Sequence, residues 1–134
     1  MQINKPVILC VDDERSVLIS LKEQLKSEFS DHYRYETASN AKEALEIMDE
    51  LITDGTKVVL IFSDWLMPGM KGDEFLCQVH QKYAETLTVL LTGEALKEAV
   101  ENAKRNANLL ACIYKPWNLN DLVKVVHQAE NAHE

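Results

Sequence analysis

The chain has 134 residues, which suits one domain with a substantial core and requires no disulfide or structural metal. Its formal net charge of −8 argues against direct binding of duplex nucleic acid and against an anionic membrane surface, since both normally need a basic face. The three cysteines show no CxxC spacing, which fits a reducing compartment. No apolar run is long enough to span a bilayer and no signal peptide is visible, so we expect a soluble cytoplasmic protein.

Five short apolar runs alternate along the chain with five segments of helical spacing. The expected strands are, in chain order, Pro6 to Val11, Tyr33 to Ala38, Val58 to Ser63, Thr86 to Leu91 and Ala111 to Tyr114. The second run is half polar, which favours the edge of a sheet. This alternation predicts one α/β domain over residues 1–134, with helices on both faces of a parallel sheet. Residues 130–134 are expected to form a polar tail that frays or begins a removed linker.

The segments between the strands each carry one apolar stripe that is expected to face the sheet. The stripes are Leu18, Leu21, Leu25 and Phe29; Ala41, Ala44, Leu45, Met48 and Leu51; Phe75, Leu76, Val79 and Tyr83; Leu96, Ala99, Val100 and Ala103; and Leu119, Leu122, Val123 and Val126. Asn40 with Glu43, and Asn118 with Asp121, resemble capping boxes and mark two helix starts.

Chemically active side chains follow four of the five expected strands. In an open parallel sheet, ligands bind beyond the carboxyl ends of the strands. The first strand ends in Asp12 and Asp13, the third in Asp64, the fourth in Thr92 and the fifth in Lys115. Asp64 closes the most continuously apolar short run of the chain, where a carboxylate has no evident structural purpose. These residues are therefore the candidate functional site.

Three carboxylates that converge on one crevice repel each other, so a cation is needed to offset them. Mg²⁺ suits the site, with Asp13 and Asp64 as direct ligands and Asp12 acting through water. Lys115 supplies a second positive charge and Thr92 a neutral hydroxyl. Such a set is suited to receive a phosphoryl group, with Asp64 as the nucleophile.

Four short motifs at these strand ends resemble those of the receiver domain of two-component response regulators, the family that includes the chemotaxis response regulator. They are Val11-Asp12-Asp13-Glu14, Ser63-Asp64-Trp65-Leu66-Met67-Pro68 with Gly72, Leu91-Thr92-Gly93, and Tyr114-Lys115-Pro116-Trp117. The resemblance covers Val7 to about Ala129. It implies a flavodoxin-like fold with strand order 2-1-3-4-5 and five helices.

The resemblance also implies a mechanism. A sensor histidine kinase or phosphotransfer protein would pass a phosphoryl group to Asp64, with Mg²⁺ bound by Asp13, Asp64 and the backbone carbonyl of Leu66. Asp12 would belong to the metal site through water. Thr92 and Lys115 would contact the phosphoryl group, and the Lys115-Pro116 peptide bond would be cis. The protein would be a signalling switch without separate substrate turnover. It would reach a downstream partner, or an output domain missing from this chain, through its fourth helix, fifth strand and fifth helix.

One position departs from the family pattern. Many receivers carry Tyr or Phe three residues before the lysine, as a ring that moves inward on phosphorylation, and here that position is Cys112. Because side chains alternate along a strand, Cys112 and Tyr114 are expected on the same face. We therefore hypothesise that Tyr114 presents a ring near the site instead.

Alternative interpretations are open at this point. A haloacid-dehalogenase-type phosphohydrolase also uses an aspartate and magnesium, but it expects an Asp-x-Asp pair where Asp12 and Asp13 are adjacent. A flavin or nucleotide carrier of the same fold would need a phosphate-binding loop after the first strand, where acids stand instead. Asp12 and Asp13 also suit a helix cap, and Trp65 and Trp117 suit loop packing.

Overall fold

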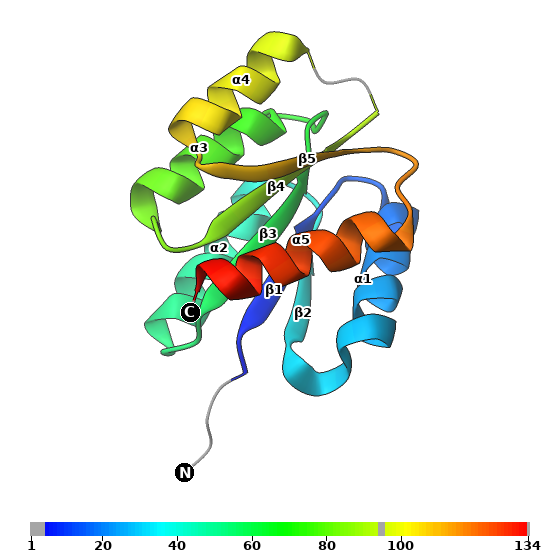
Figure 1. Cartoon of the computed structure of the whole chain (residues 1–134). Helices are drawn as coiled ribbons and strands as arrows, with labels where there is room; N and C mark the ends of the chain where they lie inside the picture. The colour runs from blue at the N-terminus through cyan, green and yellow to red at the C-terminus, as the bar shows by residue number, and fades with distance from the viewer. Residues whose placement is uncertain (1–4, 94–95, 134) are drawn as a thin grey trace.

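The computed structural model describes residues 5–93 and 96–133, which form a five-stranded parallel sheet covered by helices on both faces (Figure 1). The strands are β1 (Val7–Val11), β2 (Arg34–Ala38), β3 (Val58–Asp64), β4 (Leu87–Thr92) and β5 (Leu109–Tyr114). They are ordered β2-β1-β3-β4-β5, and every neighbouring pair is parallel. The predicted fold class and strand order are confirmed, and the half-polar β2 lies at an edge as expected.

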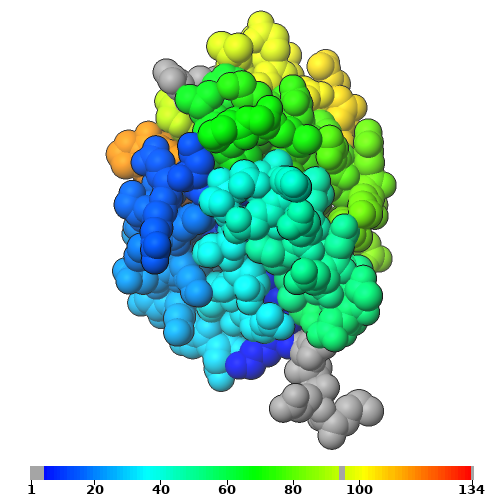
Figure 2. All heavy atoms as spheres, turned by 180° about the vertical axis from the view of Figure 1, so that it is seen from behind, coloured from blue at the N-terminus to red at the C-terminus, as the bar shows by residue number. Residues whose placement is uncertain are grey.

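The helices cover the two faces of the sheet unequally. On one face lie α1 (Arg15–Phe29) and α5 (Leu119–Ala132), with the short 3-10 helix η1 (Ser30–His32) following α1. On the other lie α2 (Ala41–Thr53), α3 (Gly72–Lys82) and α4 (Lys97–Asn106). Figure 2 shows this second face from outside, with the side chains of α2 and α3 hiding the strands beneath them. None of the helices in the described ranges is long and apolar enough to cross a membrane.

The side chains of the central strands alternate between two cores. Val7, Leu9 and Val11 of β1 pack under α2 and α3, whereas Ile8 and Cys10 pack under α1 and α5. All five are buried, which explains why β1 is continuously apolar in sequence. The predicted stripe of α1 is confirmed, because all four of its residues are buried.

The two predicted caps differ in detail. Asn118 and Asp121 form a complete capping box at the start of α5. Asn40 accepts a hydrogen bond from the Glu43 backbone N–H at the start of α2, but the Glu43 carboxylate accepts from Ser39 and not from Asn40. Both helices therefore begin at the predicted positions.

The predicted stripe of the fourth helix is confirmed only in part, because Val100 and Ala103 face the core but the stripe is mostly not buried. Leu96 precedes α4 and is 61% exposed, Ala99 and Val100 are only partly buried, and Ala103 is the one buried residue among Lys97–Asn106. The physical reason is position, because α4 lies over β5, the edge strand, and has little sheet beneath it to cover.

Candidate functional site

The parallel register brings the predicted residues to one edge of the sheet. Asp64 and Thr92 are the last residues of β3 and β4, and Asp12 directly follows β1. The backbone N–H of Asp12 donates to the Ala38 carbonyl at 3.1 Å, and that of Lys115 donates to the Thr92 carbonyl at 2.9 Å. The backbone therefore fixes the positions from which these side chains meet.

Lys115 joins the two buried carboxylates. Its Nζ lies 2.9 Å from Asp12 Oδ2 and 3.1 Å from Asp64 Oδ1. Asp12 is completely buried and Asp64 is 6% exposed, so one ammonium offsets two carboxylates that have little contact with water. Charge-assisted hydrogen bonds of this kind are stronger than neutral ones.

Asp13 completes an acidic cluster with Asp12 and Asp64. Ligand oxygens of the three carboxylates all lie within 4.8 Å of one another, and Asp13 is exposed while the other two are buried. Asp12 Oδ1 also accepts the backbone N–H of Glu14 at 2.8 Å, so both Asp12 oxygens already have protein partners. Asp13 and Asp64 therefore have more free oxygen lone pairs for a cation than Asp12 has.

An open depression of about 630 Å³ lies over this cluster. It is lined by Asp13, Glu14, Asp64, Leu66, Met67, Pro68, Lys71, Thr92, Gly93 and Lys115. All the predicted site residues except Asp12 thus line a single depression. Asp12 is fully buried and is connected to it by the ion pair with Lys115.

The ionisation of Asp64 and Lys115 is coupled. Burial raises the pKa of the Asp64 carboxyl, the Lys115 ammonium opposes that shift, and the charge of Asp12 adds to it. For Lys115, burial alone lowers the pKa, but hydrogen bonds to the two carboxylates outweigh it and the pKa is raised. Lys115 is therefore charged at neutral pH, while the ionised form of Asp64 is less favourable than that of a surface aspartate.

The loop after β3 shapes the mouth of the depression. Gly72, the first residue of α3, lies so close to β3 that a Cβ there would be 2.0 Å from the Asp64 carbonyl oxygen. Its N–H donates to the Trp65 carbonyl at 2.7 Å. On the far side the Lys115-Pro116 bond is cis, as the resemblance implied. Half-exposed Leu66 lines the depression, and its assignment as a carbonyl ligand stays a prediction.

Cys112 and Tyr114 lie near the site on β5. Cys112 is partly buried against the core under α3 and α4, and Tyr114 is 58% exposed and paired in register with Thr92. The ring of Tyr114 therefore lies outward in this structure. Its hypothesised movement is untested and stays a prediction.

The helix-cap interpretation of Asp12 and Asp13 does not hold. Helix α1 begins at Arg15, its N-cap residue is Glu14, and no side chain caps it. The bond from the Glu14 N–H to Asp12 is a short-range turn, two residues apart.

Sequence reasoning missed a second polar cluster beside the site. The indole N–H of Trp65 donates to Asp73 Oδ1 at 3.0 Å, and the Asn102 amide donates to Asp73 Oδ2 at 2.9 Å. Asp73 in the first turn of α3 looks in sequence like an ordinary helix-start acid, so no pattern indicated these contacts. The second tryptophan, Trp117, donates to Gln24 Oε1 at 2.6 Å.

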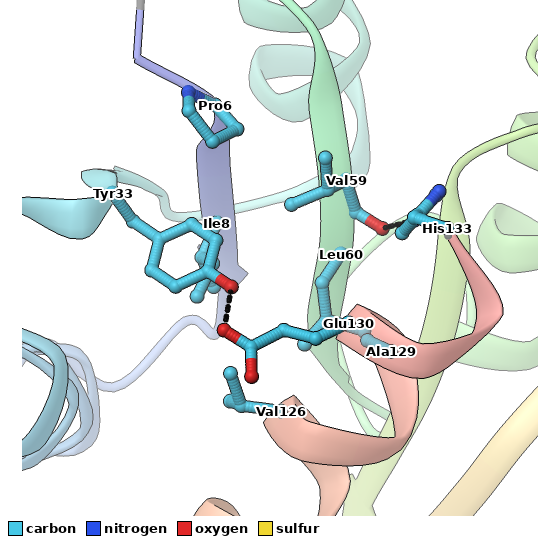
Figure 3. A pocket seen from close by; sticks show the side chains of 9 residues that line it. All are labelled: Pro6, Ile8, Tyr33, Val59, Leu60, Val126, Ala129, Glu130 and His133. Atoms are coloured by element: carbon cyan, nitrogen blue, oxygen red, sulfur yellow. Dashed lines mark hydrogen bonds between the residues drawn. The ribbon is translucent and has the colours of Figure 1, made fainter.

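A smaller pocket of about 240 Å³ lies away from the site, near the amino end of β1 and the last turns of α5 (Figure 3). Its walls are mostly apolar, and the Tyr33 hydroxyl donates to Glu130 Oε2 at 2.5 Å across its side. His133 lies at its edge with its ring against the Val59 carbonyl. This pocket lacks the converging charges of the first one.

The geometry is that of a lysine-bridged acidic cluster at the carboxyl edge of a five-stranded parallel sheet with helices on both faces. Residues 8–127 match the family model of the response regulator receiver domain, so the chain belongs to that family. A haloacid-dehalogenase assignment is not favoured.

Similar proteins carry this domain in different settings. The chain is 31% identical over 132 residues to the hydrogenase transcriptional regulatory protein HoxA of Cupriavidus necator, covering 98% of this chain and 26% of the relative. It is 29% identical to the sensor kinase CckA of Brucella abortus, covering 90% of this chain and 12% of that relative. The chain thus spans about a quarter or less of these proteins.

Solved structures agree with the fold. The signal receiver domain of an HD domain-containing protein from Pseudomonas fluorescens superposes with a TM-score of 0.84 at 28% identity, covering 99% of this chain and 93% of that one. A CheY-like receiver domain protein from Methanospirillum hungatei superposes with a TM-score of 0.82 at 29% identity, covering 97% and 98%.

Proposed function

We propose that this chain is a single phospho-accepting receiver domain, and that Asp64 takes a phosphoryl group from a phosphohistidine of a sensor kinase or phosphotransfer protein. The observation that carries the proposal is the bridge from Lys115 to Asp12 and Asp64, with Asp13 beside them. A lysine placed between carboxylates at the edge of a depression holds positive charge where phosphoryl oxygens would enter.

The acidic cluster fits Mg²⁺, which prefers oxygen ligands and is usually held by one or two carboxylates with several waters. Asp13 and Asp64 would hold the ion directly with the Leu66 carbonyl, and Asp12 would act from behind. When bound, Mg²⁺ would neutralise negative charge on the phosphoryl oxygens. The three carboxylates are close enough together to repel each other strongly, which favours uptake of a divalent cation.

The transfer itself is a substitution at phosphorus. An Asp64 carboxylate oxygen attacks the phosphorus atom, the P–N bond to the histidine breaks, and the imidazole leaves with the electron pair. The product is an acyl phosphate on Asp64. Attack by water on the same phosphorus later breaks the P–O bond to Asp64, releases inorganic phosphate and regenerates the carboxylate.

Lys115 and Thr92 would bind the phosphoryl oxygens of this product. Lys115 reaches Asp64 already, so its ammonium needs only to turn from a carboxylate oxygen to a phosphoryl oxygen. Thr92 is at the end of the neighbouring strand and lines the same depression. Phosphorylation therefore alters the contacts at the ends of β4 and β5.

The readout would be a change in the surface formed by α4, β5 and α5. Phosphorylation adds charge and acceptor oxygens, and the elements that hold Thr92 and Lys115 lead into this surface. A downstream protein or an output domain outside this chain would bind there, with no substrate turnover and no direct contact with nucleic acid. Relatives named as a transcriptional regulator and a sensor kinase support a cytoplasmic signalling role.

Intact-mass measurement after incubation with Mg²⁺ and a small acyl phosphate tests this function. The parent is expected to gain one phosphoryl group, Asp64→Asn none, and the exposed-acid control Asp49→Asn as much as the parent. Removal of Mg²⁺ by EDTA is expected to abolish the adduct. An unmodified parent that hydrolyses phosphate esters catalytically would refute the switch and favour a phosphohydrolase.

A further inference from the structure

The carboxylate of Asp73 is buried beside the proposed phosphoacceptor without a cationic partner. The residue is 8% exposed, and in residues 5–93 and 96–133 no lysine, arginine or histidine pairs with it. Burying an unpaired charge is costly unless hydrogen bonds and local dipoles compensate. Here the compensation comes from the amino end of α3 and from two neutral side-chain donors.

These two donors come from separate parts of the fold. Trp65 is the residue directly after Asp64, and its indole N–H binds one carboxylate oxygen of Asp73 at 3.0 Å. Asn102 lies in the middle of α4, and its amide binds the other oxygen at 2.9 Å. Asp73 thus joins the phosphoacceptor loop to α4 by one carboxylate group.

Both ends of this link are constrained. At the loop end, Gly72 packs closely against the Asp64 and Trp65 backbone, and its N–H bond to the Trp65 carbonyl holds the start of α3 beside Asp64. At the α4 end, Asn106 donates to Asn102 Oδ1 at 2.7 Å and orients the amide toward Asp73. The position of the Asp73 carboxylate is therefore fixed relative to the site.

Apolar packing holds α4 weakly, which makes the link matter. Ala103 is the one buried side chain among Lys97–Asn106, whereas α1 and α2 each bury four. Helix α4 lies beside α3 (Figure 1), so a hydrogen bond between these two helices restrains its position directly. A hydrogen bond to a charged group contributes more than one between neutral groups.

We infer that Asp73 is a positioning residue that couples Trp65, next to Asp64, to the position of α4 through Asn102. The coupling of Trp65 to α4 exists in the unmodified protein. Its use as a signal rests on the proposed function, since a group bound at Asp64 would shift Trp65 and thereby change the restraint on α4. The link runs along the face covered by α3 and α4 and does not pass through Thr92 or β5.

Reciprocal measurements on the unmodified protein test the link, because coupling between two sites acts equally in both directions. Asn102→Ala is expected to move the indole N–H resonance of Trp65, while that of Trp117, which binds Gln24, serves as an internal reference. Trp65→Phe is expected to speed amide hydrogen exchange in α4 several-fold. Glu101→Ala, an exposed neighbour on α4, is expected to leave the Trp65 resonance in place.

A local role of Asn102 within α4 would change exchange in α4 but would leave Trp65 unmoved, and that result would overturn the proposal. An unchanged exchange rate in Trp65→Phe would overturn it equally. Both variants are expected to fold, since neither residue is fully buried, and circular dichroism checks this.

The signalling use is tested with beryllofluoride and Mg²⁺, which imitate a phosphoryl group at Asp64. In the parent we expect binding to change α4 exchange at least threefold, and in Asn102→Ala we expect equal binding with less than half of that response. If beryllofluoride binds the parent and Asn102→Ala equally and changes α4 exchange equally in both, the signalling part of this inference is refuted and the proposed function is not. Absence of binding to the parent refutes the proposed function instead, and the reciprocal measurements then still decide whether Asp73 links Trp65 to α4.

Discussion

Replacing Lys115 by methionine is expected to destabilise the metal-free protein strongly, because it removes the ammonium that bridges Asp12 and Asp64. Both carboxylates are buried, and the Lys115 side chain is 21% exposed. Removing one partner of a fully buried ion pair costs roughly 3–5 kcal/mol. Because the lysine is partly exposed, the expected loss is at or somewhat below the lower limit of this range, about 2–3 kcal/mol.

The repulsion left behind gives a similar magnitude. One oxygen from each of the three carboxylates lies within 4.8 Å of the others. Two unit charges at that distance repel by about 3.5 kcal/mol at an effective dielectric constant of about 20. Protonation of Asp64, whose pKa burial already raises, limits this loss. The destabilisation is therefore expected to shrink as the pH falls, because an uncharged Asp64 no longer repels Asp12.

Urea unfolding in EDTA at pH 7 measures this effect, followed by circular dichroism for the parent and the variant. Lys82→Met is the matched control, since Lys82 pairs with Asp49 at the same 2.9 Å distance but on the exposed surface, where a pair contributes less than about 1 kcal/mol. Adding Asp64→Asn to Lys115→Met is expected to recover much of the lost stability. A Lys115→Met protein no less stable than Lys82→Met would refute the reasoning.

Three further predictions concern the same edge of the sheet. Asp64→Asn is expected to stabilise the metal-free protein at pH 7 by on the order of 1 kcal/mol. The pKa of Asp64 is raised in the folded protein, so the parent loses stability relative to this variant as the pH rises above the ordinary carboxyl value near 3.8. Urea midpoints of both proteins at pH 4 and pH 7 show whether their difference in stability widens. Gly72→Ala is expected to lower the unfolding free energy by about 3 kcal/mol or more, because its Cβ would meet the Asp64 carbonyl. Gly93→Ala is the control: a Cβ there would have nothing within 4 Å, so the unfolding free energy is expected to change by less than about 0.5 kcal/mol in the same assay. Mg²⁺ at tenfold its Kd is expected to add about 1.4 kcal/mol to the unfolding free energy, and Asp13→Asn is expected to remove most of this gain; equal gains in both proteins would exclude Asp13 as a ligand.

The convergence of Asp12, Asp64 and Lys115 was predictable from sequence because a parallel sheet sets all its carboxyl ends at one edge. The periodicity of the strands located those ends within one or two residues, and the fold did the rest. The exact bonding was not predictable, since the sharing of Lys115 between two carboxylates depends on distances that no spacing encodes.

The contacts of Asp73 were beyond sequence reasoning for a different reason. An acid in the first turn of a helix is stabilised there by the helix dipole alone, so Asp73 needed no further explanation. Its partner Asn102 lies 29 positions along the chain on an exposed-looking helix. The stripe expected on that helix is only partly buried, because a helix over an edge strand has little sheet to cover.

Asp64 and Asp73 are two buried carboxylates with opposite electrostatic arrangements. Asp64 has a lysine partner and two neighbouring acids, and burial together with their like charge makes its ionised form unfavourable. In the proposed function, Mg²⁺ would offset this negative charge, or the carboxylate would use it to form a bond to phosphorus. Within residues 5–93 and 96–133, the side-chain partners of Asp73 are two neutral donors, and the amino end of α3 adds its dipole. A charge change at Asp64 therefore rearranges the partners of Asp64, while Asp73 keeps its two bonds and carries any movement of Trp65 to α4.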